Sequence, residues 1–420
     1  MSCMQRITAT ILTIGDELLI GQVMDTNGAW LGQALNEIGV WVAERVTIGD
    51  TWEAIWQALD RAAATSDIII ITGGLGPTKD DLTKPLLNEY FGGKLVVHEP
   101  SLKVIEQIFK RSNRPMLEVN YKQAEVPDTC TVLLNSRGTA PGMQFERDGK
   151  LFFSLPGVPF EMKGLTETYV LKAIQERFKL GQIEHRTMTT MGMGESFVAE
   201  LLSELEAGLP AHIKLAYLPG YQSVRLRLTE QVPLGEKPLI DGYFAQMKQL
   251  LKDILVTDQD INLPEAIAQL LIKHGKTVTT AESCTGGYIA SQLTAISGAS
   301  AYIHGAIVSY DNRIKTSLLK VPTEVLAAHG AVSEQVVEIM AREVRLIMEA
   351  DYSMAVSGIL GPTGGTQDKP VGTVWIAAAS KNKIITKLCH LRYDRIRNKE
   401  ATTFQALNLL RKLMEAENEA

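Results

Sequence analysis

A small nucleophilic side chain stands at a predicted strand-to-helix turn in the last third of the chain. Residues 281–288 read AESCTGGY, and they follow the apolar run 277–280 and precede a helical pattern that continues to residue 296. Backbone N–H groups at the start of a helix lack internal partners and attract negative charge. The Ser283 hydroxyl beside such donors has the groups that acyl transfer requires. The alternative is that Ser283 or Thr285 only caps the helix, with Gly286 and Gly287 forming the turn.

Two further polar segments follow predicted strands of the same region. Residues 310–315 (YDNRIK) follow the strand predicted over 303–309, and residues 358–365 (GILGPTGG) follow the strand predicted over 352–357. A serine needs a base, no histidine lies in a strand-end motif, and Lys315 is the candidate if burial lowers its pKa. Tyr310 is a candidate to relay a proton or to orient the lysine, and the glycine loop to bind phosphate or line an oxyanion hole.

The alternatives for these residues are structural. Lys315 would be an exposed helix cation and Tyr310 an aromatic side chain at a strand end. Cys284 is a competing nucleophile, because thiolates are intrinsically strong nucleophiles. A free cysteine is more often a small buried residue, which favours Ser283.

A second group of candidate residues lies near the start of the chain. Residues 15–19 (GDELL) follow the apolar run 7–14, and residues 72–83 (TGGLGPTKDDLT) follow the run 68–71. Glycines allow backbone N–H groups to approach and cradle phosphate, and neighbouring carboxylates are suitable ligands for a divalent metal ion. The acidic candidates here are Asp16, Glu17, Asp80 and Asp81. The alternative is a set of turn glycines with an aspartate helix cap.

The elements that must position these residues form two α/β domains. Strands alternate with helices in residues 1–179 and again in 259–420, a pattern typical of doubly wound sheets, which bind ligands at the carboxyl ends of their strands. Between them, residues 180–258 predict a small α+β domain, with alternation of apolar and polar residues over 224–229. We therefore predict an α/β protein of three domains, with boundaries at 179/180 and 258/259.

Composition restricts the class of protein. The chain has 420 residues, of which 45% are hydrophobic, and a net charge of −6, which argues against general nucleic-acid binding. Its four cysteines form no C-x-x-C pair and its seven histidines no H-x-x-x-H, which argues against a zinc site or a disulfide framework. No signal peptide or membrane-spanning run is evident, so we expect a cytoplasmic protein without a membrane partner.

These motifs resemble those of the competence/damage-inducible (CinA) family. The first domain resembles its N-terminal molybdopterin-binding-type domain, with further matching residues in order along the chain. These are Lys122-Gln123-Ala124, Asn135, residues 138–142 (GTAPG), residues 155–159 (LPGVP), Glu161 and Met162. The middle segment resembles the family's KH-like domain, without the Gly-x-x-Gly loop of RNA-binding KH domains. The last domain resembles nicotinamide-nucleotide amidases in residues 281–287, 310–315, 358–365 and 370–373 (PVGT).

The resemblance implies a bifunctional hydrolase of pyridine nucleotides. The last domain would convert nicotinamide mononucleotide to nicotinate mononucleotide and ammonia, with Ser283 as nucleophile, Lys315 as base, Tyr310 as an aid to proton transfer, and no cofactor. The first domain would hydrolyse ADP-ribose-like pyrophosphates with a divalent metal ion, and Glu161 joins the acidic candidates. The family further suggests a homodimer. The open alternatives are an active first domain alone, or a pterin- or nucleotide-binding protein without catalysis.

Two positions depart from the expected pattern of the family. Leu360 stands where a smaller residue is usual, and Lys399 or Ala401 occupies a place where the family has an arginine. If that arginine binds substrate phosphate, Arg395 or Arg397 is the candidate to replace it. The substrate-binding candidates of the last domain are Thr285, Gly286, Gly287, Gly358, Gly361, Thr363, Gly364 and Arg395. Those of the first domain are Gly73, Gly74, Gly76, Thr78, Lys122 and Asn135.

Overall fold

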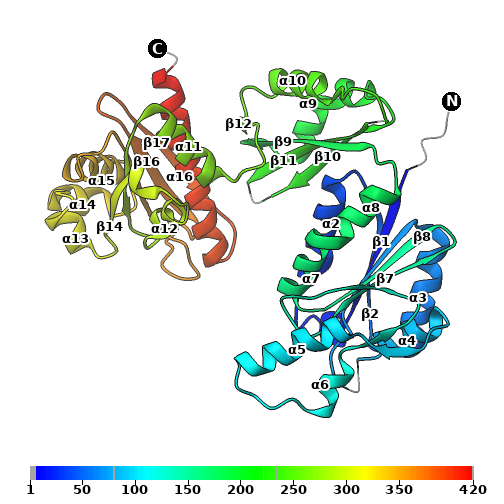
Figure 1. The fold of residues 1–420 in the computed structure, drawn as a ribbon. Coiled ribbons are helices and arrows are strands. Elements are labelled where there is room, and N and C mark those ends of the chain that lie inside the picture. The colour runs from blue at the N-terminus through cyan, green and yellow to red at the C-terminus, as the bar shows by residue number, and fades with distance from the viewer. Residues whose placement is uncertain (1–5, 79–80, 221, 233, 419–420) are drawn as a thin grey trace. The chain divides into compact units, whose positions relative to one another are not determined.

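The structure is a computed structural model that describes residues 6–78, 81–220, 222–232 and 234–418. The chain divides into two compact units, residues 1–184 with 230–239 and residues 185–229 with 240–420. Figure 1 labels the helices and strands along the chain. No helix of the described residues is long and apolar enough to cross a membrane.

The first unit contains a six-stranded mixed sheet in the order β2-β1-β3-β8-β7-β6. Strands β1, β2, β3 and β8 are parallel, whereas β7 pairs antiparallel with β8 and β6 antiparallel with β7. The strands are β1 (Thr8–Ile14), β2 (Trp41–Ile48), β3 (Ile68–Thr72), β6 (Thr131–Leu133), β7 (Gly142–Arg147) and β8 (Lys150–Leu155). Because side chains of β3 are buried on both faces, its sequence is a continuous apolar run.

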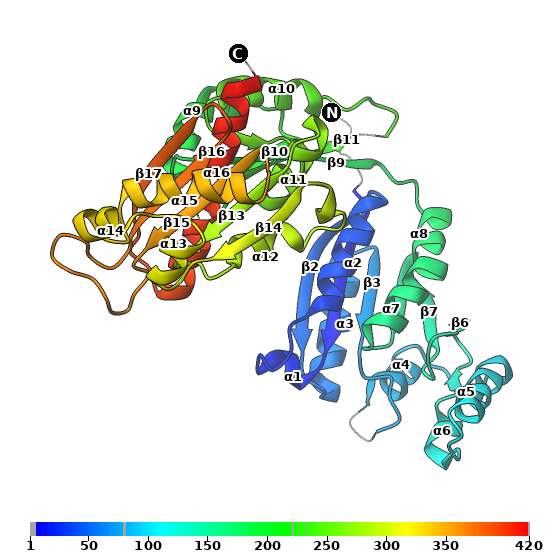
Figure 2. The ribbon, with the colours of Figure 1, turned by 90° about the vertical axis from the view of Figure 1, so that its left-hand side faces the viewer.

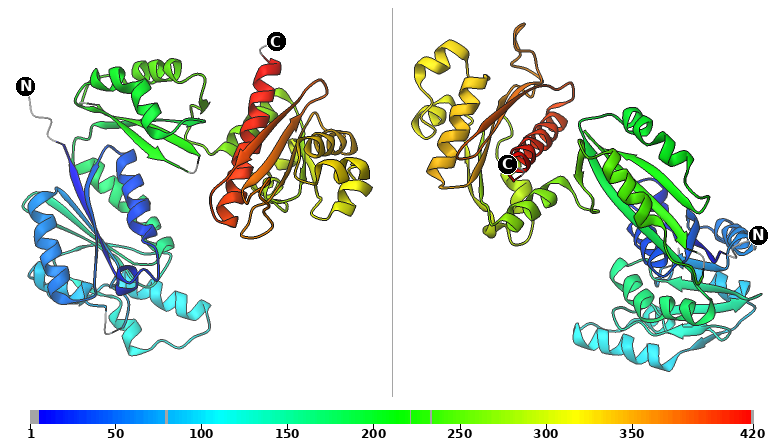
Figure 3. Two further views of the ribbon diagram at one scale, coloured as in Figure 1. Left: turned by 180° about the vertical axis from the view of Figure 1, so that it is seen from behind. Right: turned by 90° about the horizontal axis from the view of Figure 1, so that it is seen from above.

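Helices cover both faces of this sheet (Figure 3, left). One core contains apolar residues of α3 (Trp52–Thr65) and α4 (Thr83–Tyr90), and the other those of α2 (Thr26–Glu37), α7 (Pro159–Leu165) and α8 (Leu171–Arg177). A π-helical segment over Thr166–Val170 joins α7 to α8. The remaining elements are α1 (Asp16–Leu19), β4 (Leu95–Val97), α5 (Glu99–Arg111), α6 (Glu118–Lys122) and β5 (Glu125–Pro127), with β4 and β5 forming a two-stranded ribbon.

The middle segment forms a four-stranded sheet in the order β10-β11-β9-β12. Its strands are β9 (Gln182–Met191), β10 (Ile213–Pro219), β11 (Ser223–Val232) and β12 (Leu255–Thr257), and its helices are α9 (Glu195–Ala207) and α10 (Ile240–Leu250). The alternating residues of β11 place Val224, Leu226 and Leu228 in the core with apolar residues of both helices.

The C-terminal part contains a five-stranded sheet in the order β14-β13-β15-β16-β17. Strands β13 (Val278–Glu282), β14 (Ile303–Val308) and β15 (Tyr352–Gly358) are parallel, and β16 (Thr373–Ala379) and β17 (Ile384–His390) continue the sheet antiparallel. The carboxyl ends of the three parallel strands therefore lie at one edge, where the turns after residues 282, 308 and 358 begin. This is the arrangement that the sequence predicts for a site.

Helices again cover both faces of the sheet (Figure 2). One core joins α11 (Leu263–His274), α12 (Tyr288–Thr294) and α16 (Arg395–Asn418) to the strands, and the other contains α15 (Glu334–Ile347). The shorter helices are α13 (Asn312–Ser317) and α14 (Thr323–His329). The predicted fold class, two doubly wound α/β domains with a small α+β domain between them, is confirmed. The exact domain boundaries stay a prediction.

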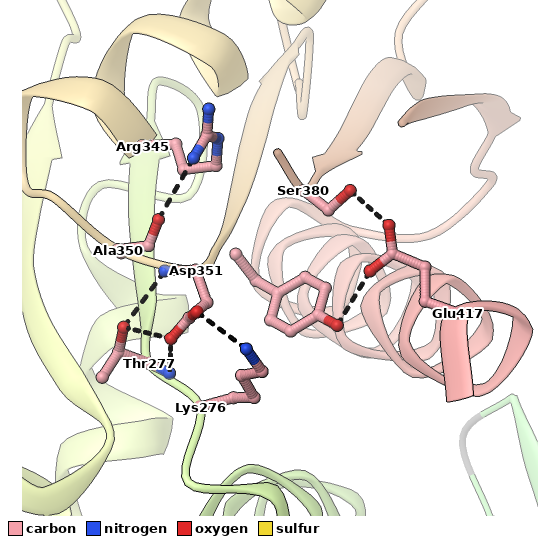
Figure 4. A network of polar contacts seen from close by, with 8 residues as sticks. Lys276, Thr277, Arg345, Ala350, Asp351, Ser380 and Glu417 are labelled. Atoms are coloured by element: carbon pink, nitrogen blue, oxygen red, sulfur yellow. Dashed lines mark hydrogen bonds and ion pairs between the residues drawn. The ribbon is translucent and has the colours of Figure 1, made fainter. Parts of the chain in front are cut away.

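A polar network fixes the opposite, amino-terminal edge of the C-terminal sheet (Figure 4). The Asp351 carboxylate accepts hydrogen bonds from the Thr277 N–H and hydroxyl at 2.9 and 3.0 Å and pairs with Lys276 at 3.1 Å. Nearby, Glu417 near the end of α16 accepts hydrogen bonds from the hydroxyls of Tyr352 and Ser380. These contacts tie the starts of β13 and β15 to each other and α16 to the sheet.

Candidate active site

The turn after β13 places Ser283 at the carboxyl edge of the sheet. The Ser283 N–H donates to the Val356 carbonyl at 3.0 Å, which continues the pairing with β15 one residue past the strand. Gly286 and Gly287 follow with φ of +64° and +94°, in the left-handed region that glycine adopts without strain. The glycine pair therefore allows the chain to reverse within five residues and to enter α12.

Lys315 reaches this turn from the first helix after β14. The side chain of Asp311 caps α13 by accepting the Arg313 N–H at 2.8 Å, and Lys315 lies one turn further along. Its Nζ lies 3.1 Å from Ser283 Oγ and 2.6 Å from the Ser309 carbonyl oxygen. Ser283 is 8% exposed and Lys315 is 1% exposed. The structure thus brings together the predicted nucleophile and the predicted base.

Burial lowers the pKa of Lys315, and the negative charge of Asp311 opposes that shift only in part. A lowered pKa increases the fraction of neutral amine at a given pH, and a neutral amine is what a general base requires. Burial acts in the opposite direction on the neighbouring thiol and raises the pKa of Cys284 to about 12. Cys284 is therefore a protonated, buried thiol, which favours Ser283 as the nucleophile.

The backbone donors after Ser283 are partly engaged within the protein. The Gly287 N–H donates to the Glu282 carboxylate at 2.9 Å, and the Gly286 N–H to the Ser283 carbonyl at 3.2 Å. Among the described residues, no hydrogen bond occupies the Thr285 N–H, and the buried Thr285 hydroxyl also has no partner. Of the backbone N–H groups of Thr285, Gly286 and Gly287, that of Thr285 is therefore the one left to bind a developing oxyanion.

Tyr310 and Arg395 link the Lys315 segment to the glycine loop. Tyr310 is 63% exposed, and its hydroxyl accepts a hydrogen bond from Arg395 at 3.1 Å. The same guanidinium donates to the Gly361 carbonyl at 2.7 Å. Tyr310 also places its carbonyl oxygen 3.5 Å from Lys315 Nζ. Arg395, rather than Arg397, is therefore the arginine that reaches the predicted loop, since Arg397 pairs with Asp394.

In the loop after β15, some glycines pack closely against neighbouring side chains and others are exposed to solvent. A Cβ at Gly358 or Gly361 would lie within 2.6 Å of the Val374 or Val371 side chain, so no larger residue fits without a shift. Thr363 and Gly364 are exposed. Leu360 is buried in the core, where its size serves packing.

The glycine loop of the first domain folds around Asp81. The Asp81 carboxylate accepts the N–H groups of Gly76 and Thr78, each at 2.8 Å. Gly73 has φ of +113°, and a Cβ there would lie 2.4 Å from the Ile14 carbonyl oxygen. The ends of β1 and β3 are consequently in direct backbone contact, and the loop is held by its own aspartate.

The other predicted residues of the first domain lie in separate contacts. Asp16 exchanges backbone-to-carboxylate hydrogen bonds with Asp50 at 3.0 and 3.3 Å, and the Glu17 carboxylate lies against Gly15. Asn135 is buried and donates to Glu161 at 2.6 Å; burial raises the pKa of Glu161, an effect that this bond partly offsets.

The predicted metal ligands do not gather into a site within the part of the chain that the structure describes. No group of three or more His, Cys, Asp or Glu side chains there is placed to hold a metal ion. Asp81 and Glu161 are engaged by internal donors, and Asp80 lies outside the described residues. The described carboxylates therefore form no ready-made cluster of metal ligands, and we derive no chemical step through a metal ion.

Sequence reasoning missed two charged residues beside these sites. Lys84, directly after the glycine loop, donates to the carbonyls of Lys122 and Gln123 at 3.2 and 3.1 Å, and burial lowers its pKa to about 8. The side chain of Lys122 pairs with Glu118. Glu282 is the second missed residue. Its position directly before the candidate nucleophile is the feature of the sequence that could have identified it.

Comparisons with known proteins cover almost the whole chain. Residues 10–176 match the family described as probable molybdopterin binding domain, residues 185–255 the damage-inducible protein CinA KH domain, and residues 260–414 the CinA C-terminal domain. A CinA-like protein of Cytophaga hutchinsonii is 44% identical over 414 residues, which are 97% of this chain and 98% of that protein. A putative competence-damage inducible protein of Caldicellulosiruptor bescii is 39% identical over 406 residues, 96% of this chain and 98% of that protein.

Solved structures match a smaller share of the chain than these relatives do. The crystal structure of a competence/damage inducible protein from Agrobacterium tumefaciens is 38% identical, covers 36% of this chain and 96% of its own, and gives a TM-score of 0.35. A protein from Thermoplasma acidophilum, described as CinA with unknown function, is 33% identical with coverages of 40% and 99% and a TM-score of 0.37.

Proposed function

The chain belongs to the CinA family, and from this premise we propose that its C-terminal domain hydrolyses the carboxamide of nicotinamide mononucleotide. The products would be nicotinate mononucleotide and ammonia. The observation that carries the proposal is the 3.1 Å contact between Ser283 Oγ and the buried Lys315 Nζ. A hydroxyl beside an amine of lowered pKa is an activated nucleophile, and such a pair performs acyl transfer in unrelated folds.

The proposed reaction begins with attack of Ser283 Oγ on the carboxamide carbon. Neutral Lys315 accepts the hydroxyl proton as the bond forms, and the Thr285 N–H stabilises the oxyanion. The protonated amine then gives its proton to the departing ammonia, with Tyr310 assisting. Water, deprotonated by the same amine, attacks the acyl carbon. The bond to Ser283 Oγ breaks, the ammonium of Lys315 returns its proton to Oγ, and the acid leaves. The Ser309 carbonyl oxygen, 2.6 Å from Nζ, stabilises the ammonium form between these steps.

Arg395 and the glycine loop support recognition of a nucleotide phosphate in the proposal. The guanidinium keeps its planar donor fork at an exposed position while Gly361 and Tyr310 fix its orientation. A fixed guanidinium suits phosphate, because it offers paired donors in a rigid geometry. The proposed substrate is accordingly a small phosphorylated carboxamide.

The test is ammonia release from nicotinamide mononucleotide by the purified full chain, with nicotinamide riboside as a matched substrate without phosphate. We expect release from the mononucleotide, a higher KM for the riboside, and a higher KM for the mononucleotide in Arg395→Gln. No release by correctly folded protein would refute the amidase. Equal KM values for both substrates would refute the phosphate contact alone.

A second proposed activity belongs to the N-terminal domain. The loop of Gly73 to Thr78, followed by the half-buried amine of Lys84, favours a ligand that carries phosphate. We propose that this domain binds ADP-ribose-like pyrophosphates and hydrolyses them when a divalent metal ion is supplied. Turnover of ADP-ribose with Mg²⁺, Mn²⁺ or Co²⁺ but not with chelator supports hydrolysis. Binding without turnover would leave a nucleotide- or pterin-binding domain.

We further propose a cytoplasmic homodimer that does not use nucleic acid as a partner. The net charge of −6 supports the last point. Light scattering on a sizing column tests the oligomeric state, and a mass of one chain would refute the dimer. Salt-sensitive binding to a DNA duplex would contradict the proposed absence of a nucleic-acid partner.

A further inference from the structure

Glu282 carries a fully buried carboxylate directly before the candidate nucleophile. It is 0% exposed, and one oxygen accepts the N–H groups of Gly287 and Ile289 at 2.9 and 3.1 Å. The other oxygen accepts the Ala290 N–H at 2.8 Å and the Thr280 hydroxyl at 3.1 Å. A buried charge is tolerated when its oxygens are hydrogen-bonded in this way, and the start of α12 offers it a favourable dipole.

The backbone of the same residue is connected to the other half of the dyad. The Glu282 carbonyl oxygen accepts the Ser309 N–H at 2.7 Å, and the Ser309 carbonyl oxygen accepts from Lys315 Nζ at 2.6 Å. On its other side, Ser283 is paired with Val356 through its N–H. One residue thus joins the helix that follows the nucleophile to the strand end that holds the base.

We propose that Glu282 is a positioning residue that holds the Ser283 turn against α12, so that the serine hydroxyl faces Lys315. The inference rests on the proposed function of this site. Because the N–H groups of Gly287, Ile289 and Ala290 donate to this carboxylate, they cannot at the same time donate to a developing oxyanion. The Thr285 N–H, which has no hydrogen-bond acceptor among the described residues, stays available for that task.

Glu282→Gln is the sharpest perturbation because it keeps the size of the side chain. The amide oxygen of glutamine can still accept two of the N–H groups, but its NH2 group would then face the third N–H donor. The start of α12 should shift to relieve this contact. A displacement of a fraction of an ångström at Ser283 is expected to lower the rate of the chemical step by about tenfold or more.

The readout is the rate at which a fluorophosphonate labels Ser283 in the full chain, followed by intact mass. In that reaction Ser283 Oγ forms a bond to phosphorus, the P–F bond breaks, fluoride leaves and Lys315 takes the hydroxyl proton. It therefore reports the activation of the serine without a natural substrate. We expect labelling of Glu282→Gln to be slower than that of wild type by about tenfold or more, and its amidase kcat to fall with KM little changed.

Asp351→Asn is the matched control, because Asp351 also receives a backbone N–H and a hydroxyl hydrogen bond but lies at the opposite edge of the sheet. It should lower the melting temperature and leave labelling at the wild-type rate. If Glu282→Gln does not fold, Thr280→Val replaces it, since it removes one bond to the same carboxylate, and slower labelling is expected.

The outcomes distinguish a failure of the proposed amidase from a failure of the positioning role of Glu282. A wild-type protein that is never labelled at Ser283 would refute the activated serine itself and the positioning role with it. Labelling of wild type and Glu282→Gln at equal rates, or equal slowing in Asp351→Asn at equal loss of stability, would refute the positioning role and leave the proposed amidase intact.

Discussion

Lys315→Met should abolish turnover. The stability of this variant relative to wild type should be higher at neutral pH than at alkaline pH. The Lys315 side chain is 1% exposed, and burial lowers its pKa in the folded protein. In the unfolded chain the same group titrates near its ordinary pKa of about 10.4. Methionine has a similar shape and carries no proton, so it removes this difference between the two states.

The direction of this pH dependence follows from the number of protons that Lys315 binds in the folded and unfolded states. Above about pH 10.4 the lysine is neutral in both states, and its pKa shift has no effect on stability. As the pH falls below that value, the unfolded chain takes up a proton that the folded chain does not, until the lowered folded pKa is reached. Over this interval the folded state loses about 1.4 kcal/mol for each pKa unit between the two values.

Hydrogen bonding acts in the opposite direction at every pH. Methionine leaves the buried Ser309 carbonyl oxygen without the donor that lies 2.6 Å away in the wild type. An unsatisfied buried acceptor costs about 1–3 kcal/mol. The variant should thus be less stable than wild type at pH 10.5 and should regain that difference, or exceed it, at pH 7.

Calorimetric scans of the full chain at pH 7, 9 and 10.5 test this expectation, with ammonia release measured on the same samples. Lys412→Met, at an exposed position of the same domain, is the control and should show no such pH dependence. A difference between Lys315→Met and wild type that is the same at all three pH values would show that Lys315 titrates normally, and the reasoning on the base would fail.

Three further predictions address single features of the molecule. Cys284→Ala should keep turnover within about twofold, since the buried thiol is protonated; loss of turnover would make the thiol the nucleophile. Asp351→Asn should cost about 1 kcal/mol of unfolding free energy at pH 7. Burial opposes ionisation of this carboxyl, but its hydrogen bonds prevail and lower its pKa, so the difference should vanish in acid as the pH falls through the lowered value; a difference that persists there would contradict the shift. Gly73→Ala should lower the melting temperature, because a Cβ would lie 2.4 Å from the backbone carbonyl oxygen of Ile14, whereas Gly242→Ala, with nothing within 4 Å, should not; equal melting temperatures would contradict the close packing.

The parts of the C-terminal site that were predictable lie at strand ends. Ser283 and Lys315 each follow a predicted strand, and parallel strands bring their carboxyl ends to one edge, so their proximity follows from the fold class. The hydrogen-bond partner of each polar atom in the site does not follow from the fold class. Nothing in the sequence shows that the Gly287 N–H points at Glu282, because that depends on the φ values of two successive glycines.

The first domain was less predictable for the same reason. The Gly-rich loop and its aspartates appear in the sequence as a site for phosphate and metal, and the structure uses Asp81 to hold the loop closed through Gly76 and Thr78. Short, exposed or fully buried strands were also missed. The three residues of β4 are all exposed, and β8 pairs parallel on one side and antiparallel on the other, so neither shows a simple alternation.

The central claim is that Ser283 and Lys315 act as one catalytic unit. Ammonia release from nicotinamide mononucleotide, measured on wild type, Ser283→Ala and Lys315→Met, tests it most directly. We predict release by the wild type and loss of release in both variants, whose melting temperatures at pH 7 identify them as folded. Undiminished release in either variant, or none from the wild type, would contradict the account.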